Sequence, residues 1–362
     1  KSIPAKAYGS QTAEPVVNAF RKCPNLTMVA PNHAMYQERS RALMNYLTSI
    51  CPDIEQVSID ECYMDYTPIS GRYASAEAAS AFIKDSILQT FGFTVNVGIG
   101  SCKILAKMAS DFEKPDKVHT LFLHEIPQKM WPLPVGELFT VGGSTADKLR
   151  QAKIMTIGDL AKADLVRVQK IVGTKMGKHI HDYANGIDPS PVLAEPEEAK
   201  GYSISTTLEE DVKKAAQAYP VLLALADSVT ARIRSDGAKA YCIAVTIRDN
   251  SFKTRSHQRS LMNPTDISKE VYEISKELFD ELWDGATPLR LLGIAMTNIT
   301  REETMQFSLF QDESREKSRK IDKAKDALNA KFGVATIVRG SSIQSKIDVG
   351  KKYQAQIEQK KK

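Results

Sequence analysis

Apolar positions along the first third of the chain alternate between helical and strand-like spacing. Residues 33–50 carry apolar side chains three and four positions apart, which predicts an amphipathic helix. The run QVSIDECYMDYT at 56–67 predicts a strand, residues 74–90 a second helix, and FTVNVGIG at 93–100 a second strand. A further helix is predicted to end near Pro115, because proline ends helices. Alternating helices and strands favour an α+β fold in which helices cover a sheet.

The rest of the chain divides into three kinds of sequence. Residues 132–188 have mostly helical patterns with glycine between them, and the Pro- and Glu-rich stretch that follows predicts a linker. From Tyr202 onward, strand patterns return in YSISTTL, YCIAVTIRD and LRLLGIAMTNIT, separated by helices near 213–234 and 268–283. Beyond Arg301 the chain is polar and charged, with one apolar cluster, MQFSLF. The pattern predicts a second α+β unit and a polar C-terminal tail.

Composition narrows the class of protein. A chain of 362 residues with 42% hydrophobic content is long enough for about two to three domains. No apolar run reaches the roughly 18 residues of a membrane span, and the first residues lack the pattern of a signal peptide, so we expect a cytoplasmic protein without membrane contact. Five scattered cysteines without a C-x-x-C pair argue against a disulfide framework or a zinc site. The opening KSIPAKAYG lacks an initiator Met, and we expect the chain to begin inside a longer protein.

Positive charge is concentrated in one window. The net charge of the chain is +5, and residues 231–259 contain seven basic residues against two acidic ones. A one-sided balance on a strand-rich segment predicts contacts with the phosphates of duplex DNA, for which Arg255 and Arg259 are the candidates. The alternative is a solvated basic face without a partner.

Two neighbouring carboxylates, Asp60 and Glu61, interrupt the strand-like run at 56–67. Neighbouring side chains of a regular strand point to opposite faces, so both can serve one site only where the strand ends or bulges. DECY is therefore predicted to lie at a hairpin tip. Two hard oxygen ligands there suit Mg²⁺, which accepts one or two protein carboxylates together with substrate phosphates. The chemistry predicted is phosphoryl transfer, and the alternative is a solvated turn.

Two motifs in order carry a family resemblance. SIDECYMDYT, followed by VNVGIGSCKILAKMASDFEKPD, resembles the palm of Y-family translesion DNA polymerases of bacteria. The resemblance extends to AKAYGSQTAEPV in the fingers, to FTVGGSTADKLRQAKIMTIGDLA and ANGIDPSPV in the thumb, and to SISTTLEED at the start of a little finger. It implies a multidomain α+β, right-hand polymerase with palm, partial fingers, helical thumb and little finger. Ile3 stands where the DinB-type branch has Tyr, which points to the UmuC-like branch.

The resemblance assigns roles to single residues. Asp60 and Glu61 match the carboxylates that bind two Mg²⁺ ions, and Lys6 and Lys114 match basic residues that contact the triphosphate of the incoming deoxynucleoside triphosphate. A further metal-binding Asp and the steric gate against ribonucleotides lie upstream of these motifs in the family. Neither is present in this chain, and we expect both in the upstream part of the full-length protein.

The thumb-like segment resembles a helix-hairpin-helix. Gly142, Gly143, Thr145 and Lys148 stand where backbone N–H groups at a helix N-terminus receive a DNA phosphate. The family usually has Gly-x-Gly, whereas this chain has Thr140 two positions before Gly142, which predicts a departure from the usual hairpin geometry. An ordinary turn between two helices is the alternative.

The apolar cluster of the C-terminal tail resembles a docking peptide. Gln306, Leu309 and Phe310 match the short segment by which bacterial polymerases bind the ring-shaped sliding clamp. Packing of the cluster against the protein's own core is the alternative.

The predicted function is DNA-templated nucleotide addition opposite damaged bases, as part of DNA repair in the SOS response. Its partners are primer–template DNA, a deoxynucleoside triphosphate and the sliding clamp, which places the protein at the nucleoid. A non-catalytic DNA-binding accessory subunit and another palm-type two-metal enzyme, such as a nucleotide cyclase, are the alternatives. The predicted domains are partial fingers (1–30), palm (31–121), thumb (122–190), linker (191–200), little finger (201–300) and a polar tail with the clamp motif (301–362).

Overall fold

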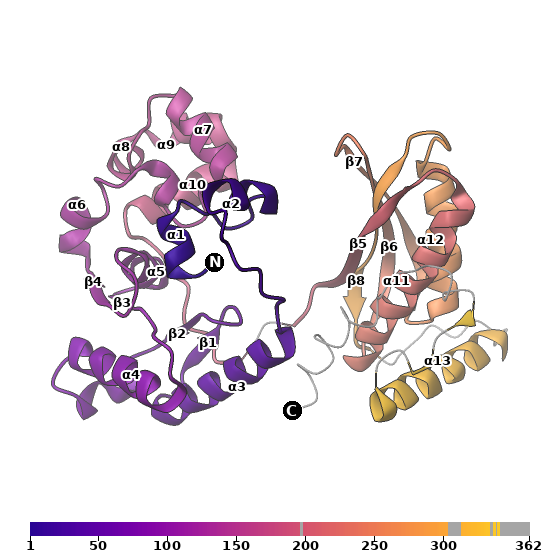
Figure 1. Cartoon of the computed structure of the whole chain (residues 1–362), viewed down its shortest axis with the longest axis horizontal. Helices are drawn as coiled ribbons and strands as arrows, with labels where there is room; N and C mark the ends of the chain where they lie inside the picture. Colours follow the sequence, from indigo (N-terminus) through magenta and orange to yellow (C-terminus); the bar gives the residue numbers. More distant parts are fainter. Residues whose placement is uncertain (196–197, 303–312, 334–335, 338, 341–362) are drawn as a thin grey trace.

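The computed structural model describes residues 1–195, 198–302, 313–333, 336–337 and 339–340. They form two bodies (Figure 1). No helix among these residues is long and apolar enough to cross a membrane. Gln306, Leu309 and Phe310, the predicted clamp-binding residues, lie outside the described residues.

The first body contains all elements before residue 187. Its helices are α1 (Ile3–Ala7), α2 (Val16–Lys22), α3 (His33–Ile50), α4 (Ala76–Phe91), α5 (Lys103–Asp111), α6 (Ile126–Lys129), α7 (Gly143–Gln151), α8 (Ile157–Lys162), α9 (Leu165–Val172) and α10 (Thr174–Ala184). Its strands are β1 (Ile54–Gln56), β2 (Cys62–Met64), β3 (Val97–Gly100) and β4 (Val118–Leu121). The predicted helix at 33–50 and the alternation of helices with strands are confirmed.

The strands of the first body form two pairs. β1 and β2 are antiparallel, and β3 and β4 are parallel. Two glycines of β3 have a packing reason, because a Cβ on Gly98 would lie 2.0 Å from the carbonyl oxygen of Ala106 and one on Gly100 2.6 Å from the Ala106 nitrogen. Only glycine lets α5 pack directly on the backbone of β3. The position of α5 is therefore set by these two residues.

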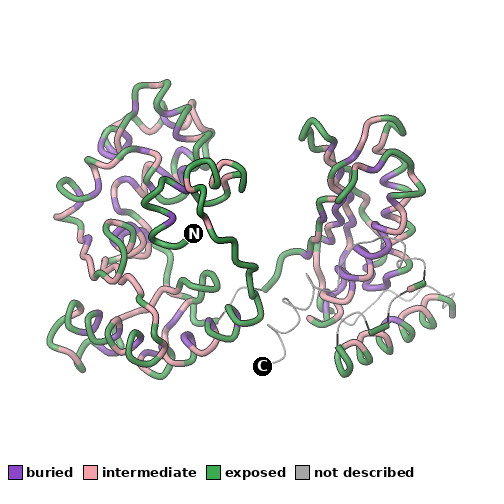
Figure 2. The backbone as a smooth tube through the Cα atoms, in the orientation of Figure 1, coloured by how far each residue is buried: buried purple, intermediate pink, exposed green. Residues whose placement is uncertain are grey.

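Two cores hold the first body together. A smaller one joins α3, β1 and α4 through Leu43, Leu47 and Ile83, among others. The larger one joins α5, from the predicted palm, to the helices of the predicted thumb. Figure 2 shows this buried interior as purple segments. Because α5 shares its core with the thumb helices, any residue that α5 presents is held fixed relative to the thumb.

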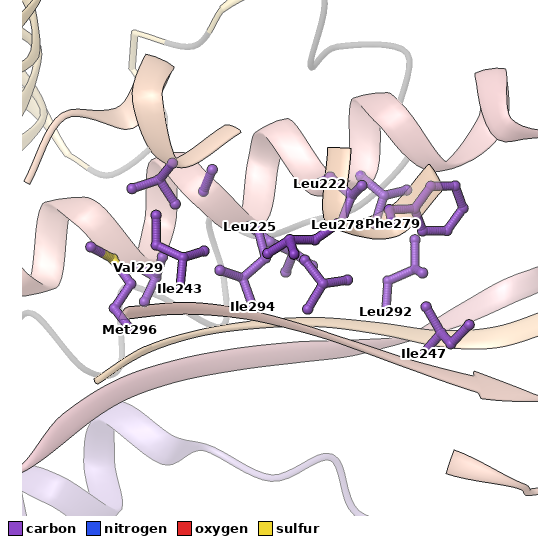
Figure 3. Packing of buried hydrophobic residues seen from close by; sticks show 14 of the residues in the cluster. Leu222, Leu225, Val229, Ile243, Ile247, Leu278, Phe279, Leu292, Ile294 and Met296 are labelled. Atoms are coloured by element: carbon purple, nitrogen blue, oxygen red, sulfur yellow. The ribbon is translucent and has the colours of Figure 1, made fainter. Parts of the chain in front are cut away.

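The second body is an antiparallel sheet with helices on one face. The strand order is β5–β8–β6–β7, formed by β5 (Gly201–Val212), β8 (Leu289–Thr300), β6 (Lys239–Asp249) and β7 (Thr254–Thr265). Helices α11 (Ala215–Ser235) and α12 (Ser268–Leu282) pack on this sheet through an apolar core. Figure 3 shows side chains such as Leu222 and Phe279 from the helices meeting Ile243, Ile294 and Met296 from the strands.

The register separates the two faces of the sheet. Rows such as Ile204–Ile294–Val245–His257 lie on the helix-covered face, since their central members are buried. The intervening rows lie on the opposite, open face. The open face consists mainly of small and hydroxyl-bearing side chains together with one arginine: Ser203, Ser205, Thr207, Leu291, Gly293, Ala295, Ala244, Thr246, Arg248, Thr254, Ser256 and Gln258.

Two elements after residue 250 were not predicted from the sequence. Strand β7 was not predicted, because TRSHQRSLMNPT lacks the apolar alternation of a half-buried strand and pairs only as the outer strand of the sheet. The predicted polar tail contains helix α13 (Glu313–Phe332), which lies beside the second body (Figure 1). Its contacts with that body include several ion pairs. Apolar periodicity does not predict a helix that is held by ion pairs.

Candidate active site and nucleic-acid interface

Asp60 and Glu61 lie in the short loop between β1 and β2, as the hairpin prediction required. The loop closes where the Val57 and Ser58 backbone N–H groups donate to the Glu61 carbonyl oxygen, at 3.0 and 3.2 Å. The Ser58 hydroxyl donates to Asp60 Oδ1 at 2.8 Å. Leaving the strand ladder at Gln56 frees both carboxylates from strict alternation, and both side chains are exposed. The loop therefore presents two hard oxygen donors to an approaching cation.

A chain of ion pairs runs from Glu61 to Lys114. Lys107 Nζ lies 2.7 Å from Glu61 Oε1 and 3.2 Å from Asp111 Oδ2, and Lys114 Nζ lies 2.6 Å from Asp111 Oδ1. Burial alone would lower the pKa of Lys107, but its hydrogen bonds to Glu61 and Asp111 outweigh burial and raise that pKa above its usual value. The structure thus brings a predicted metal ligand and a predicted triphosphate contact into one network.

A second lysine of α5 anchors the base of the hairpin. Lys103 forms an ion pair with Glu55 on β1, and Glu55 also accepts a hydrogen bond from the Leu193 backbone N–H at 2.7 Å. Burial would raise the pKa of Glu55, but these hydrogen bonds outweigh it and hold the pKa below its usual value. Asp188 accepts from the Ile104 backbone N–H at 3.2 Å, at the start of α5. The chain leaving the thumb is therefore fixed to the hairpin and to α5.

Sequence reasoning did not single out Lys103, Lys107 or Asp111. Their spacing contains a signal, because residues four positions apart lie on one face of a helix. A helix with charged residues every four positions, in a chain where a hairpin carries carboxylates, is a candidate to form ion pairs with that hairpin. The spacing alone does not name the partners, which depend on how α5 packs on β3.

Lys6 and Cys62 have simpler surroundings. Lys6 lies on α1 with an exposed side chain, and no described contact joins it to the hairpin loop; its triphosphate role stays a prediction. Burial raises the pKa of the Cys62 thiol to about 11, so it is protonated at neutral pH. The thiol beside the two carboxylates is a packing group, in agreement with its strand position.

The hairpin carboxylates can supply some of the ligands of a metal ion, but not all of them. Among the residues that the structure describes, no three His, Cys, Asp or Glu side chains cluster as a metal-binding group. Asp60 and Glu61 are exposed oxygen donors on a rigid hairpin, which is the donor type that Mg²⁺ accepts in combination with phosphate oxygens. Two carboxylates are compatible with a metal that is also bound by substrate.

The predicted DNA-binding hairpin of the thumb lies at the start of α7. Gly142 is the N-cap residue and Gly143 the first helical residue, and a Cβ at either position would meet nothing within 4 Å. Residues 142–144 are exposed, so the start of the helix is open to an approaching ligand. Thr145 and Lys148 lie in the first two turns of the same helix, with Lys148 exposed. The N-terminus of α7 has the features of an anion-binding site.

Thr140 adopts a backbone conformation that favours glycine. Its φ is +76°, in the left-handed region that is costly for a β-branched residue. The position that is usually glycine in the resembling hairpins thus keeps the left-handed conformation with a threonine. The sequence predicted a departure from the usual hairpin geometry. The structure shows a strained backbone at Thr140.

Replacing Thr140 by glycine should raise the free energy of unfolding of the first body by about 1 kcal/mol, because strain relief exceeds the added chain entropy of glycine. Urea denaturation followed by Trp131 fluorescence measures this change. Thr145→Gly is the matched control, and it should lower the stability by up to about 0.5 kcal/mol, because Thr145 is helical and glycine has a lower helix propensity than threonine. A loss of stability in both variants would contradict the strain at Thr140.

The structure places Arg255 and Arg259 on the helix-covered face of the second sheet. They stand opposite Ile247 and Ile243, which belong to the core. Arg259 pairs with Glu277 and, at 2.7 Å, with Glu281 of α12, and Arg255 lies 3.9 Å from Asp284. Acidic side chains thus balance both arginines, and the open face is the other side of the sheet. Contact of these two arginines with DNA stays a prediction.

Three family models match this chain. Residues 1–111 match the impB/mucB/samB family, residues 199–309 match the C-terminal domain of that family, and residues 136–188 match the thumb domain described for DNA polymerase-iota. Together these ranges include the hairpin carboxylates, the thumb hairpin and the second sheet.

Curated relatives align along most of the chain. DNA polymerase IV of Clostridium acetobutylicum is 40% identical over 341 residues, covering 94% of this chain and 85% of the relative. DNA polymerase IV of Bacillus velezensis is 36% identical over 349 residues, covering 95% and 83%. DNA polymerase IV 1 of Bacillus subtilis is 35% identical over 352 residues, with the same coverage. Assignment to the UmuC-like branch, based on Ile3, stays a prediction.

Solved structures confirm the predicted fold class. A Y-family DNA polymerase chimera containing Dbh segments superposes with a TM-score of 0.71 at 22% identity, covering 82% of this chain and 86% of the chimera. An insertion ternary complex of Dbh DNA polymerase gives a TM-score of 0.55 at 22% identity, covering 83% and 87%. With the relatives at 32–40% identity, these likenesses lead to one conclusion. This chain belongs to the impB/mucB/samB family and is a bacterial Y-family DNA-directed DNA polymerase.

Proposed function

We propose that this polymerase adds nucleotides opposite damaged template bases and that Asp60 and Glu61 bind the catalytic Mg²⁺ ions. The observation that supports these residues is the ion-pair chain Glu61–Lys107–Asp111–Lys114. It joins a carboxylate proposed to bind metal to a lysine proposed to contact the triphosphate. Curated relatives named DNA polymerase IV support the polymerase reaction.

Bound Mg²⁺ would activate the attacking oxygen and stabilise the leaving phosphate oxygen. The protein's own contribution is position. Ser58 orients Asp60, Lys107 orients Glu61, and the hairpin holds both carboxylates at the surface where substrate phosphates can complete the ligand set. Lys114 and Lys6 supply positive charge for the triphosphate of the incoming nucleotide.

Two surfaces are proposed to contact the DNA. The N-terminus of α7, with Gly142, Gly143, Thr145 and Lys148, would receive a phosphate of the primer–template duplex through backbone N–H groups. The open face of the second sheet would meet phosphates through its hydroxyl groups and Arg248. Both surfaces recognise backbone without reading bases, which suits a polymerase that must accept damaged templates.

Primer extension across an abasic site by the full-length protein tests the proposed activity. We expect extension past the lesion in the presence of Mg²⁺. The same assay on an undamaged template distinguishes the polymerase from the alternative, a non-catalytic accessory subunit. Tight binding to primer–template DNA without extension on either template would identify a non-catalytic accessory subunit.

Salt dependence tests which face of the second sheet meets DNA. Each lost phosphate contact should reduce the slope of log affinity against log salt by about 0.9, so Arg248→Gln should reduce it by about that amount. Arg259→Gln is the matched control, because its charge is balanced by Glu277 and Glu281, and its slope should equal that of the unmodified protein. A reduced slope for Arg259→Gln with no change for Arg248→Gln would instead support the helix-covered face, as the sequence predicted.

We further propose that Gln306, Leu309 and Phe310 bind the sliding clamp. The pattern Gln, apolar, Ser, Leu, Phe combines one hydrogen-bonding side chain with two apolar anchors, which is sufficient for a short peptide to dock in a hydrophobic pocket. Replacing Leu309 and Phe310 by alanine should weaken clamp binding by at least about 2 kcal/mol. Thermal stability and clamp-free extension should not change. Earlier melting with unaltered clamp binding would assign the two residues to the protein's own core.

A further inference from the structure

Lys107 is enclosed by three parts of the first body. Its Nζ lies 2.7 Å from Glu61 of the hairpin, 3.2 Å from Asp111 of its own helix, and 5.9 Å from the ring centre of Phe139, which precedes the thumb hairpin. The Lys107 side chain is only 15% exposed, whereas that of Glu61 is 48% exposed. Because Gly98 and Gly100 fix α5 against β3, the ammonium cannot move far from the hairpin with its helix.

An ammonium at hydrogen-bonding distance satisfies the same electrostatic need of a carboxylate that a metal ion satisfies. A divalent cation that binds Glu61 would stand within a few ångströms of Lys107, and two cations that close repel each other strongly in partly buried surroundings. The metal ion and the Lys107 ammonium therefore cannot both bind the Glu61 carboxylate at full strength. Asp111, 3.2 Å from the Lys107 Nζ on the same helix, offers Lys107 a second acceptor.

We infer that Lys107 is a positioning residue that holds Glu61 while no metal is bound and transfers to Asp111 when the metal binds. The Glu61–Lys107 ion pair then competes with the metal for the same carboxylate. This inference rests on the proposed role of Glu61 as a metal ligand. The ion-pair network would then take part in metal exchange, in addition to holding the site residues in place.

Binding of Mn²⁺ to the full-length protein, without DNA or nucleotide, tests the competition. Electron paramagnetic resonance of the free ion measures the dissociation constant directly and does not depend on activity. Lys107→Met should bind Mn²⁺ at least about fivefold more tightly, because a competing cation is removed. Lys107→Arg keeps the charge and should bind like the unmodified protein. Lys117→Met removes a lysine that pairs with Glu113 and should cause no change.

Glu61→Gln separates failure of the inference from failure of the proposed function. It should weaken Mn²⁺ binding, and adding Lys107→Met to it should have no further effect. Unchanged binding in Glu61→Gln would refute the metal role of Glu61. Weaker binding in Glu61→Gln, together with unchanged or weaker binding in Lys107→Met, would refute only the competition.

A measurement on the unmodified protein covers the case in which Lys107→Met does not fold. With ¹³C at the lysine Cε positions, the signal that is missing in Lys107→Arg identifies Lys107. Addition of Mg²⁺ should shift this signal while that of Lys117 stays in place. A Lys107 signal that does not respond to Mg²⁺ at concentrations that support extension would overturn the inference.

Discussion

Primer extension should fall by at least about a thousandfold when Asp60 or Glu61 is replaced by alanine in the full-length protein. Phosphoryl transfer by this type of enzyme depends on positioning metal ions, and the protein has little covalent chemistry that could substitute for a lost ligand. Both side chains are exposed at the hairpin loop, so their removal leaves no cavity, and Lys107 keeps Asp111 as an acceptor when Glu61 is replaced. Rates of single-nucleotide addition under saturating DNA measure the effect.

DNA binding separates loss of catalysis from loss of structure. Affinity for primer–template DNA should stay within about twofold in both variants, because the proposed DNA contacts lie on α7 and the second sheet. Asp85→Ala, which removes an exposed carboxylate from α4, is the matched control and should extend primers normally. Extension at a normal rate by Asp60→Ala or Glu61→Ala would remove that residue from the metal site.

The second large effect is expected at Arg234, an arginine of α11 that holds the C-terminal helix. Its side chain is 5% exposed and forms a two-pronged contact with Asp326 of α13, at 2.7 and 3.2 Å. It also lies 3.5 Å from Asp322, which is fully buried. Asp322 accepts from the Ser268 backbone N–H at 2.8 Å and pairs with Arg339 at 2.9 Å. This network ties α11, α12 and α13 together.

Replacing Arg234 by methionine should lower the free energy of unfolding of the second body by about 3 to 5 kcal/mol. Methionine preserves much of the packing but removes the main counter-charge of Asp326 and one of the two counter-charges of the buried Asp322. Breaking a buried charge network is far more costly than losing a surface pair. Urea denaturation followed by Trp283 fluorescence measures this body, and Trp131→Phe removes the signal of the first body.

Arg232→Met provides the control on the same helix. Arg232 is half-buried, donates to the Ser203 carbonyl oxygen, forms no ion pair with a described residue and stacks over Tyr202, so its loss should cost at most about 1 kcal/mol. Equal denaturation midpoints for Arg234→Met and Arg232→Met would mean that α13 does not depend on the buried network.

The sequence contained enough information to predict the hairpin. Asp60 and Glu61 are adjacent, and adjacent residues can share a site only where a strand ends, so the loop between β1 and β2 followed from local geometry. Gly142 and Gly143, at the start of α7, likewise predicted a helix N-terminus there through their resemblance to a helix-hairpin-helix. Such features depend on residues close together in the chain, which is why motifs and a family resemblance were sufficient to predict them.

Local patterns were not sufficient where a side chain's partner comes from a distant segment. Arg255 and Arg259 are part of a basic run in the sequence, yet strand alternation turns them to the side of α12. There, acids of α12 pair with Arg259, and Asp284, just beyond the helix, lies near Arg255. Helix α13 has few apolar positions and docks through charge, which apolar periodicity does not detect.

The sequence by itself determined the family, the α+β class and the place of the two carboxylates in a hairpin loop, because each is encoded in contiguous motifs. Only the tertiary structure decided which charges meet. Packing of α5 on Gly98 and Gly100 brings Lys107 to Glu61, 46 residues away, and the register of β7 chooses the face on which its arginines lie. An ion pair depends on the distance between two atoms in space, and for residues this far apart that distance is set by packing, which no local pattern records.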